Sequence, residues 1–280
     1  MPPIQILFGT DGSAAAAAGI DLLRRLPLPE GSAIHVVSAV DAQPTTTETG
    51  SWSRLAALTE RAREEAAGFA REAGEQLVRP GVRVTTEVRS GKPADEVCRA
   101  AADAGADLIV IGPTGRAGLE SIILGSVADS IVKRAQASVL VARPVRHELR
   151  RVIVATDGSA NAERAVRKVG RLPLPAESCV VLTHVLETQR IMTHEELQAV
   201  EPARSILDTA RASIAESGHS VETQVRSGDP REELLDQARE IGADLIVCGA
   251  RGASLIEGLL WGSVADRLVK HAPCSVLVVK

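Results

Sequence analysis

The chain has 280 residues and a formal net charge of −4, and this length accommodates two domains. Hydrophobic residues make up 45% of it but aromatic residues only 1%, so Val, Ile, Leu and Ala must fill the cores. The acidic balance argues against a broad basic surface for nucleic acid. No apolar stretch approaches the roughly 20 residues that cross a bilayer, and the N-terminus lacks the pattern of a secretion signal. We therefore expect a soluble cytoplasmic protein with neither a nucleic-acid nor a membrane partner.

Two sets of landmarks indicate that the chain contains two copies of one domain. ILFGTDGS at residues 6–13 returns as IVATDGS at residues 153–159, with Asp11 and Asp157 lying 146 positions apart. GADLIV at residues 105–110 recurs only 137 positions later, which predicts a net deletion of nine residues, placed near residues 44–52 of the first copy. A repeat this long indicates a duplicated domain rather than a solenoid. We expect domains at residues 1–144 and 151–280, joined by a short polar stretch.

Within each copy, short apolar segments alternate with longer segments of helical period. In chain order, we expect strands at 4–8, 33–39, 82–88, 107–111 and 138–142, with helices at 13–25, 53–78, 93–104 and 125–136. Strands of the second copy are expected at 152–155, 179–185, 220–225, 244–248 and 275–279. This alternation predicts right-handed crossovers and a parallel sheet with helices on both faces. The fold class is therefore α/β, with two tandem doubly wound domains.

The turns after the first and fourth strands of each copy are the candidate binding loops, because ligands of doubly wound sheets bind beyond the carboxyl ends of the strands. Thr-Asp-Gly-Ser follows the first strand at residues 10–13 and 156–159. Gly-x2-Gly-x9-Gly-Ser follows the fourth strand, from Gly112 and from Gly249. We expect its glycines to provide close backbone approach and positive φ. Its last Gly-Ser should open a helix whose N–H groups and dipole favour phosphate.

A purely structural interpretation of both motifs stays open. Asp and Ser are preferred helix N-caps, and glycines also end helices and form turns. Other chemistry is disfavoured, since the chain has no G-x-G-x-x-G after a first strand and no G-x-x-x-x-G-K-[ST]. The His and Cys residues form no metal-ligand spacing, so we expect no metal site and buried, reduced thiols.

The Thr-Asp-Gly-Ser turn and the Gly-x2-Gly-x9-Gly-Ser-Val pattern resemble the universal stress protein family, and this resemblance covers essentially the whole chain. It implies five parallel strands per domain in the order 3-2-1-4-5, and ATP between the first and fourth strands. It also implies pairing of the two halves through their fifth-strand edges. Carried over position by position, the nucleotide contacts would be Asp11, Ala39, Gly112, Gly115, Gly125, Ser126 and Val127, then Asp157, Val185, Gly249, Gly252, Gly262, Ser263 and Val264.

The resemblance implies an ATP-binding stress protein that acts as a nucleotide-dependent sensor or regulatory scaffold, read by an unidentified protein partner. No catalytic residue is assigned, and whether Mg²⁺ accompanies the phosphates stays open. A slow ATPase or nucleotidyl-type transferase is the alternative, with Arg116 and Arg251 as the motif-embedded clamp candidates. An interaction module with vestigial glycine loops is a further alternative.

The two sites should differ in affinity, because their walls differ in sequence. Ala39 of the first copy corresponds to Val185 of the second, Ile111 corresponds to Cys248, and Thr114 corresponds to Arg251. A larger apolar wall and an added guanidinium both favour the second copy, so we expect its site to be the tighter one. Trp261, which replaces Leu124 of the first copy, is expected to pack beside the following helix.

Overall fold

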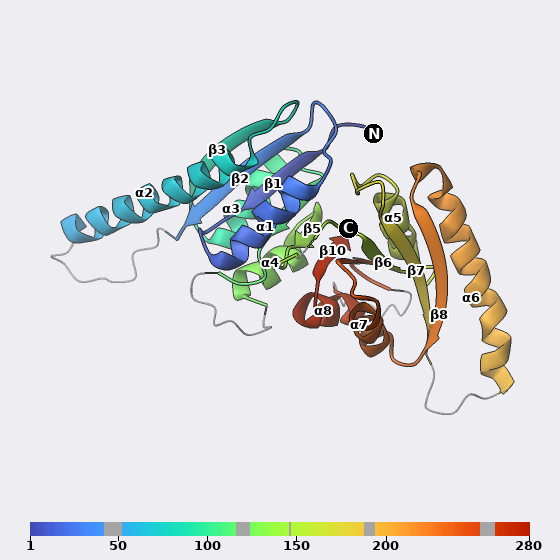
Figure 1. The fold of residues 1–280 in the computed structure, drawn as a ribbon. Helices are drawn as coiled ribbons and strands as arrows, with labels where there is room; N and C mark the ends of the chain where they lie inside the picture. Colours follow the sequence, from blue (N-terminus) through green and yellow to red (C-terminus); the bar gives the residue numbers. More distant parts are fainter. Residues whose placement is uncertain (42–51, 116–123, 146, 188–193, 253–260) are drawn as a thin grey trace. The chain divides into compact units, whose positions relative to one another are not determined.

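The computed structural model describes residues 1–41, 52–115, 124–145, 147–187, 194–252 and 261–280 (Figure 1). The chain divides into two compact units. One comprises residues 2–24 and 28–142, and the other comprises residues 143–280 with Met1 and residues 25–27. The segment where the sequence predicts the nine-residue deletion, residues 44–52, lies almost wholly outside the described residues.

The first domain is a parallel α/β sheet with the predicted elements. It contains β1 (Gln5–Gly9), α1 (Ala14–Arg25), β2 (Ala33–Val40), α2 (Trp52–Leu77), β3 (Arg83–Ser90), α3 (Pro93–Asp103), β4 (Leu108–Ile111), α4 (Ser126–Arg134) and β5 (Ser138–Val141). Its strands pair in the order β3-β2-β1-β4-β5, and every pairing is parallel. All four residues of β4 are buried, as an apolar strand covered on both faces requires.

The second domain repeats this arrangement. It contains β6 (Arg151–Ala155), α5 (Ala160–Val169), β7 (Cys179–Leu186), α6 (His194–Ser213), β8 (Ser220–Ser227), α7 (Pro230–Ile241), β9 (Leu245–Gly249), α8 (Ser263–His271) and β10 (Ser275–Val279), with a short 3-10 helix at Ala215–Ser217. The strands pair in parallel in the order β8-β7-β6-β9-β10. Helix α5 contacts α6, and α7 contacts α8, so each face of the sheet carries one helix pair. The predicted fold class is confirmed.

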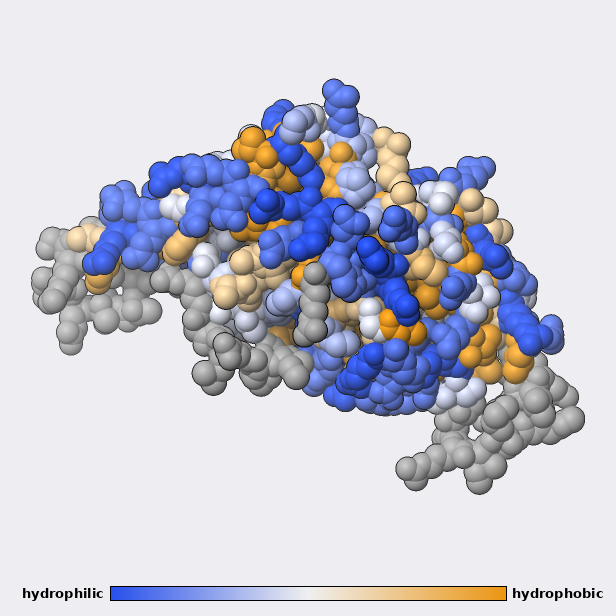
Figure 2. All heavy atoms as spheres, viewed as in Figure 1, coloured by the Kyte–Doolittle hydropathy of each residue, from blue (hydrophilic) through white to orange (hydrophobic). Residues whose placement is uncertain are grey.

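The helices are amphipathic in the way the sequence predicts. Buried alanines and Leu77 form the inner side of α2 (Ala66, Ala70, Ala73). Hydrophilic residues follow the side of α2 that is visible in Figure 2. Helices α3 and α7 begin with proline, which suits the first turn because its missing N–H would have no partner there. Among the described helices, none is both long and apolar enough to span a membrane.

The repeated Gly-Ala-Asp sequence fixes the first and fourth strands of each copy side by side. Gly242 ends α7 in the left-handed conformation, with φ 61°. Asp244 Oδ2 then accepts hydrogen bonds from the backbone N–H groups of Arg150 (2.8 Å) and Arg151 (2.9 Å), at the start of β6. Asp107 Oδ2 accepts in the same way from Gln5 N, 2.9 Å away, at the start of β1. These two carboxylates therefore hold the starts of the first and fourth strands together at one edge of the sheet.

We expect Asp244→Ala to lower the free energy of unfolding of the second domain by about 1.5–3 kcal/mol, because it removes a buried, charged acceptor from two backbone N–H groups. Asp244→Asn keeps one acceptor oxygen and should cost less. Urea denaturation followed by circular dichroism measures the change. The control is Asp236→Ala, which breaks an exposed ion pair with Arg239 and should change stability by less than about 0.5 kcal/mol. An Asp244→Ala protein as stable as this control would contradict the role given to Asp244.

Candidate functional site

The turn after the first strand of each domain is closed by its own side chains. In the first domain, Ser13 N donates to Asp11 Oδ1 at 3.1 Å, and Gly12 N donates to Thr10 Oγ1 at 3.2 Å. Gly12 has a φ of 73°, in the left-handed region that favours glycine. The second domain repeats the turn, with Ser159 N donating to Asp157 Oδ1 at 3.0 Å. One carboxylate is thereby fixed at the carboxyl edge of each sheet.

The serine of this turn, and not the aspartate, caps the helix that follows. Ser13 Oγ accepts from Ala16 N at 3.1 Å, and Ser159 Oγ accepts from Ala162 N at 3.3 Å. The structural interpretation of the motif therefore applies to the serine. The aspartate instead shapes the turn with one oxygen, and its other oxygen is directed towards the second loop.

The glycine loop after the fourth strand packs against this turn. A Cβ atom on Gly115 would lie 2.7 Å from Oδ2 of Asp11, and a Cβ atom on Gly252 would lie 2.7 Å from Oδ2 of Asp157. The first glycine of each motif meets the helix that the turn opens. A Cβ atom on Gly112 would lie 2.7 Å from the carbonyl oxygen of Ala15. At Gly112 the Cβ atom would meet backbone, so this position requires glycine, whereas at Gly115 and Gly252 the end of the aspartate side chain would have to shift.

Positive φ is not the reason for the glycines of this loop, which corrects one prediction from the sequence. We expected positive φ in this loop, but none of the motif glycines has it: Gly112, Gly115, Gly125, Gly249, Gly252 and Gly262. Their backbone conformations are open to other residues. The missing Cβ atom, rather than an unusual dihedral angle, is what lets the loop reach the turn.

The last glycine of each motif precedes a helix that has no side-chain cap. Gly125 and Gly262 hold the N-cap positions of α4 and α8, and neither helix has a capping hydrogen bond from a side chain. Gly125 N donates instead to Pro113 O at 2.8 Å, and Gly262 N donates to Ala250 O at 3.0 Å. These two bonds fold the helix start back onto the glycine loop. The first N–H groups of a helix have no intrahelical partner, so they remain available to an anion.

The residues after the cap glycines lie at the helix starts, as predicted. Ser126, Val127 and Ser263 are exposed, and Val264 is half-buried. An acidic residue follows in each first turn, and a lysine one turn later neutralises it: Lys133 Nζ lies 2.9 Å from Asp129, and Lys270 Nζ lies 2.8 Å from Asp266. The repulsion that these carboxylates would exert on a bound phosphate is thereby reduced.

The predicted base-side residues, Ala39 and Val185, stand at the carboxyl ends of β2 and β7 and are half-buried. These strands pair directly with β1 and β6, so both residues share the sheet edge that carries the aspartate turn. In the second domain His184 precedes Val185, and its Nδ1 lies 2.9 Å from the carbonyl oxygen of Thr156.

Only part of the predicted difference between the two sites involves accessible residues. Ile111 and Cys248 are both buried, 4% and 3% exposed, so this pair belongs to the sheet interior. Burial raises the pKa of the Cys248 thiol to about 12 and keeps it neutral. Thr114 is half-buried and Arg251 is exposed, so this pair, with Ala39 and Val185, still distinguishes the two edges.

Trp261 lies beside α8, as expected for a packing residue. Its indole N–H donates to Asp266 Oδ1 at 3.3 Å, and Lys280 Nζ lies 4.9 Å from the centre of the ring. Arg116, the other clamp candidate, lies outside the described residues. Within the described part of the chain, no group of three or more His, Cys, Asp or Glu residues could hold a metal ion.

Two residues at the turn were missed by the motif analysis. The ring of Phe69, in α2, lies against Gly12, and Ile206, in α6, lies against Gly158. They occupy matching positions, 137 residues apart, so the repeat offset could have paired them. The chain has only two Phe residues, and this scarcity was a second usable signal.

Both domains match one known protein family. The family model described as "Universal stress protein family" matches residues 5–143 and again residues 148–280. A universal stress protein of Methanocaldococcus jannaschii is 32% identical over 146 residues, covering 51% of this chain and 84% of the relative. The crystal structure of a universal stress protein from Archaeoglobus fulgidus covers 99% of this chain and 98% of its own, with a TM-score of 0.70 and 22% identity, and so shares the fold. The chain belongs to the universal stress protein family, with two tandem family domains.

Proposed function

We propose that each domain binds one ATP molecule at the carboxyl edge of its sheet, between the aspartate turn and the glycine loop. One observation carries this proposal. In both domains an aspartate oxygen faces a glycine of the loop at the same separation, 2.7 Å from the position of its missing Cβ atom, and the loop leads into a helix without a side-chain cap. The loop backbone and the helix start thus converge on one place.

The phosphates would lie at the starts of α4 and α8. The unpaired N–H groups there and the helix dipole stabilise negative charge. The hydroxyls of Ser126 and Ser263, both exposed at the first helical position, add a donor. A chain with a net charge of −4 can bind phosphate in this way, because the donors are backbone groups.

The base and ribose would lie nearer the turn. Asp11 and Asp157 present carboxylate oxygens that accept hydrogen bonds from ribose hydroxyls or a base amine. Ala39 and Val185 supply apolar surface at the ends of the neighbouring strands. The family resemblance implies nucleotide contacts at these same positions, and for this reason we propose ATP among phosphate-bearing ligands.

The protein would act as a nucleotide-dependent sensor or scaffold in the stress response, read by a protein partner. Backbone amides and a serine hydroxyl hold phosphate in place, whereas fast hydrolysis also needs a group that activates water. Turnover should therefore be slow. Arg251, exposed beside Gly252, is a candidate phosphate contact in the second domain.

We expect Gly115→Ala to lower the ATP affinity of the first domain, and Gly252→Ala that of the second, by at least about tenfold each, equivalent to about 1.4 kcal/mol. The added methyl would lie 2.7 Å from the aspartate oxygen, so the carboxylate would have to turn away from the place where we propose that it meets the nucleotide. Isothermal titration calorimetry on nucleotide-free protein measures the affinities.

Gly68→Ala is the matched control, because its added methyl, in α2, meets nothing within 4 Å. It should leave both affinities unchanged. If Gly115→Ala and Gly252→Ala both fold, as judged by circular dichroism, and both bind ATP like the Gly68→Ala control, the glycines are structural only and the proposed site is wrong.

We further expect two nucleotides per chain, with the second domain binding more tightly. The two extra methylene-sized groups of Val185 over Ala39 would contribute on the order of 1 kcal/mol if they contact the base. Arg251→Thr, which installs the residue of the first copy, should reduce the difference between the sites. Titration of Gly252→Ala reports the affinity of the first site, and titration of Gly115→Ala reports that of the second. A single site per chain, or a first site that binds more tightly than the second, would contradict this expectation.

Steady-state hydrolysis should stay well below about 1 per second, a common enzymatic rate. Release of inorganic phosphate from the wild-type chain at saturating ATP and Mg²⁺ measures it, with the double variant Gly115→Ala/Gly252→Ala as the background control. A rate above this value that the double variant abolishes would favour the enzymatic alternative.

A further inference from the structure

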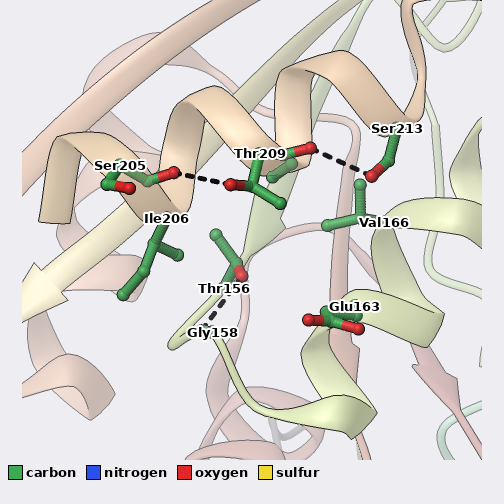
Figure 3. A pocket seen from close by; sticks show the side chains of 9 residues that line it. Thr156, Gly158, Glu163, Val166, Ser205, Ile206, Thr209 and Ser213 are labelled. Carbon is green, nitrogen blue, oxygen red and sulfur yellow. Dashed lines mark hydrogen bonds between the residues drawn. The ribbon is translucent and has the colours of Figure 1, made fainter. Parts of the chain in front are cut away.

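The second domain has a cleft that shares the turn at residues 156–159 with the proposed nucleotide site but is otherwise lined by helices α5 and α6. It has a volume of about 150 Å³ and lies between α5 and α6, behind the turn that carries Asp157 (Figure 3). The lining residues come from that turn and from the two helices: Thr156, Gly158, Glu163, Val166, Ser205, Ile206, Thr209, Ala210 and Ser213. All of them belong to one compact unit.

The cleft combines an apolar wall with oxygen atoms. Val166, Ile206 and Ala210 supply the apolar surface, and Ile206 points from α6 towards the turn (Figure 3). Along α6, Thr209 Oγ1 donates to Ser205 O at 2.9 Å, and Ser213 Oγ donates to Thr209 O at 2.9 Å. Because each of these hydroxyl protons is already used, the hydroxyl oxygens can offer only their lone pairs to a ligand.

The cleft has one acidic side chain in its lining. Among its described lining residues Glu163 is the charged one, in the first turn of α5. Its carboxylate pairs with Arg167 at 3.4 Å, and both side chains are 51% exposed. An exposed pair of this kind contributes little, about 0–1 kcal/mol, so a ligand cation can replace it. Oxygen acceptors and a carboxylate favour donors and cations and disfavour a phosphate group.

The first domain has a larger side chain at the corresponding position. Phe69 stands where the second copy has Ile206, and its ring lies directly against Gly12. Ile206 is smaller, and its side chain stays 3.1 Å from the position of a Cβ atom on Gly158. Ala17 stands in the first copy where the second has Glu163, so the carboxylate is also specific to the second domain.

We propose that this cleft is a second ligand site, specific to the second domain, for a small amphipathic cation with a ring or branched alkyl body and a primary ammonium group. A cavity of about 150 Å³ in another protein holds one benzene molecule, so the volume fits a single ring. The ring packs on Val166, Ile206 and Ala210. The ammonium group donates to Glu163 and to the hydroxyl oxygens of α6.

Benzylamine is the probe, titrated into the full-length chain and followed by two-dimensional NMR of the backbone amides. We expect saturable shifts in the millimolar range that centre on α5, α6 and the turn at residues 156–159. Ile206→Phe copies the first domain and should abolish these shifts. Ala212→Phe places the same ring on an exposed position of α6, outside the lining, and should leave binding unchanged.

Glu163→Gln keeps the shape of an exposed side chain and tests the charge separately. It should weaken benzylamine at least threefold and leave the binding of benzyl alcohol unchanged. Three results would each overturn the proposal. The first is shifts that do not saturate, and the second is equal benzylamine affinity in the wild type and a folded Ile206→Phe protein. The third is equal binding of benzoate and benzylamine. Should Ile206→Phe fail to fold, the Glu163→Gln comparison still decides it.

Discussion

The close contact between one carboxylate and one glycine organises the candidate site in each domain. Asp11 and Gly115 lie about a hundred positions apart in the sequence, yet a Cβ atom on Gly115 would lie 2.7 Å from Oδ2 of Asp11. Asp157 and Gly252 repeat this geometry in a copy whose sequence has otherwise diverged. Two loops can meet in this way only if the strands that carry them are fixed side by side.

The rest of the sheet provides that fixation. The carboxylates of Asp107 and Asp244 bind the starts of the first strands beside the fourth strands, at the edge opposite the site. The parallel pairing of β1 with β4, and of β6 with β9, carries the register across the sheet. Gly125 and Gly262 then open α4 and α8, whose N-termini have no side-chain cap. The strand register, the close approach of the loop and the helix dipole all concern the starts of α4 and α8. For this reason we propose that the phosphates bind there.

Much of this could be predicted from sequence, because periodicity and repetition report on local structure. The strands of both copies and the helices of the first copy lie within about two residues of their expected limits, and the predicted Gly-Ser pairs open α4 and α8. The conformation of the glycines could not be predicted from the sequence. A glycine that close packing requires and a glycine that a positive φ requires are the same letter in a sequence. Which member of Asp-Gly-Ser caps the helix depends on turn geometry. Ile111 and Cys248 are buried in the sheet and so do not line the site. Phe69 and Ile206 contact the turn from α2 and α6, which contain no recognisable motif.

The central claim is that the aspartate turn, the glycine loop and the helix start form one nucleotide site in each domain. The most direct measurement is a crystal structure of the full-length chain with ATP, determined from crystals grown in its presence. The account predicts phosphate density at the N-termini of α4 and α8, with the ribose or base within hydrogen-bond distance of Asp11 and Asp157. Nucleotide bound elsewhere, with phosphates away from both helix starts, would contradict it.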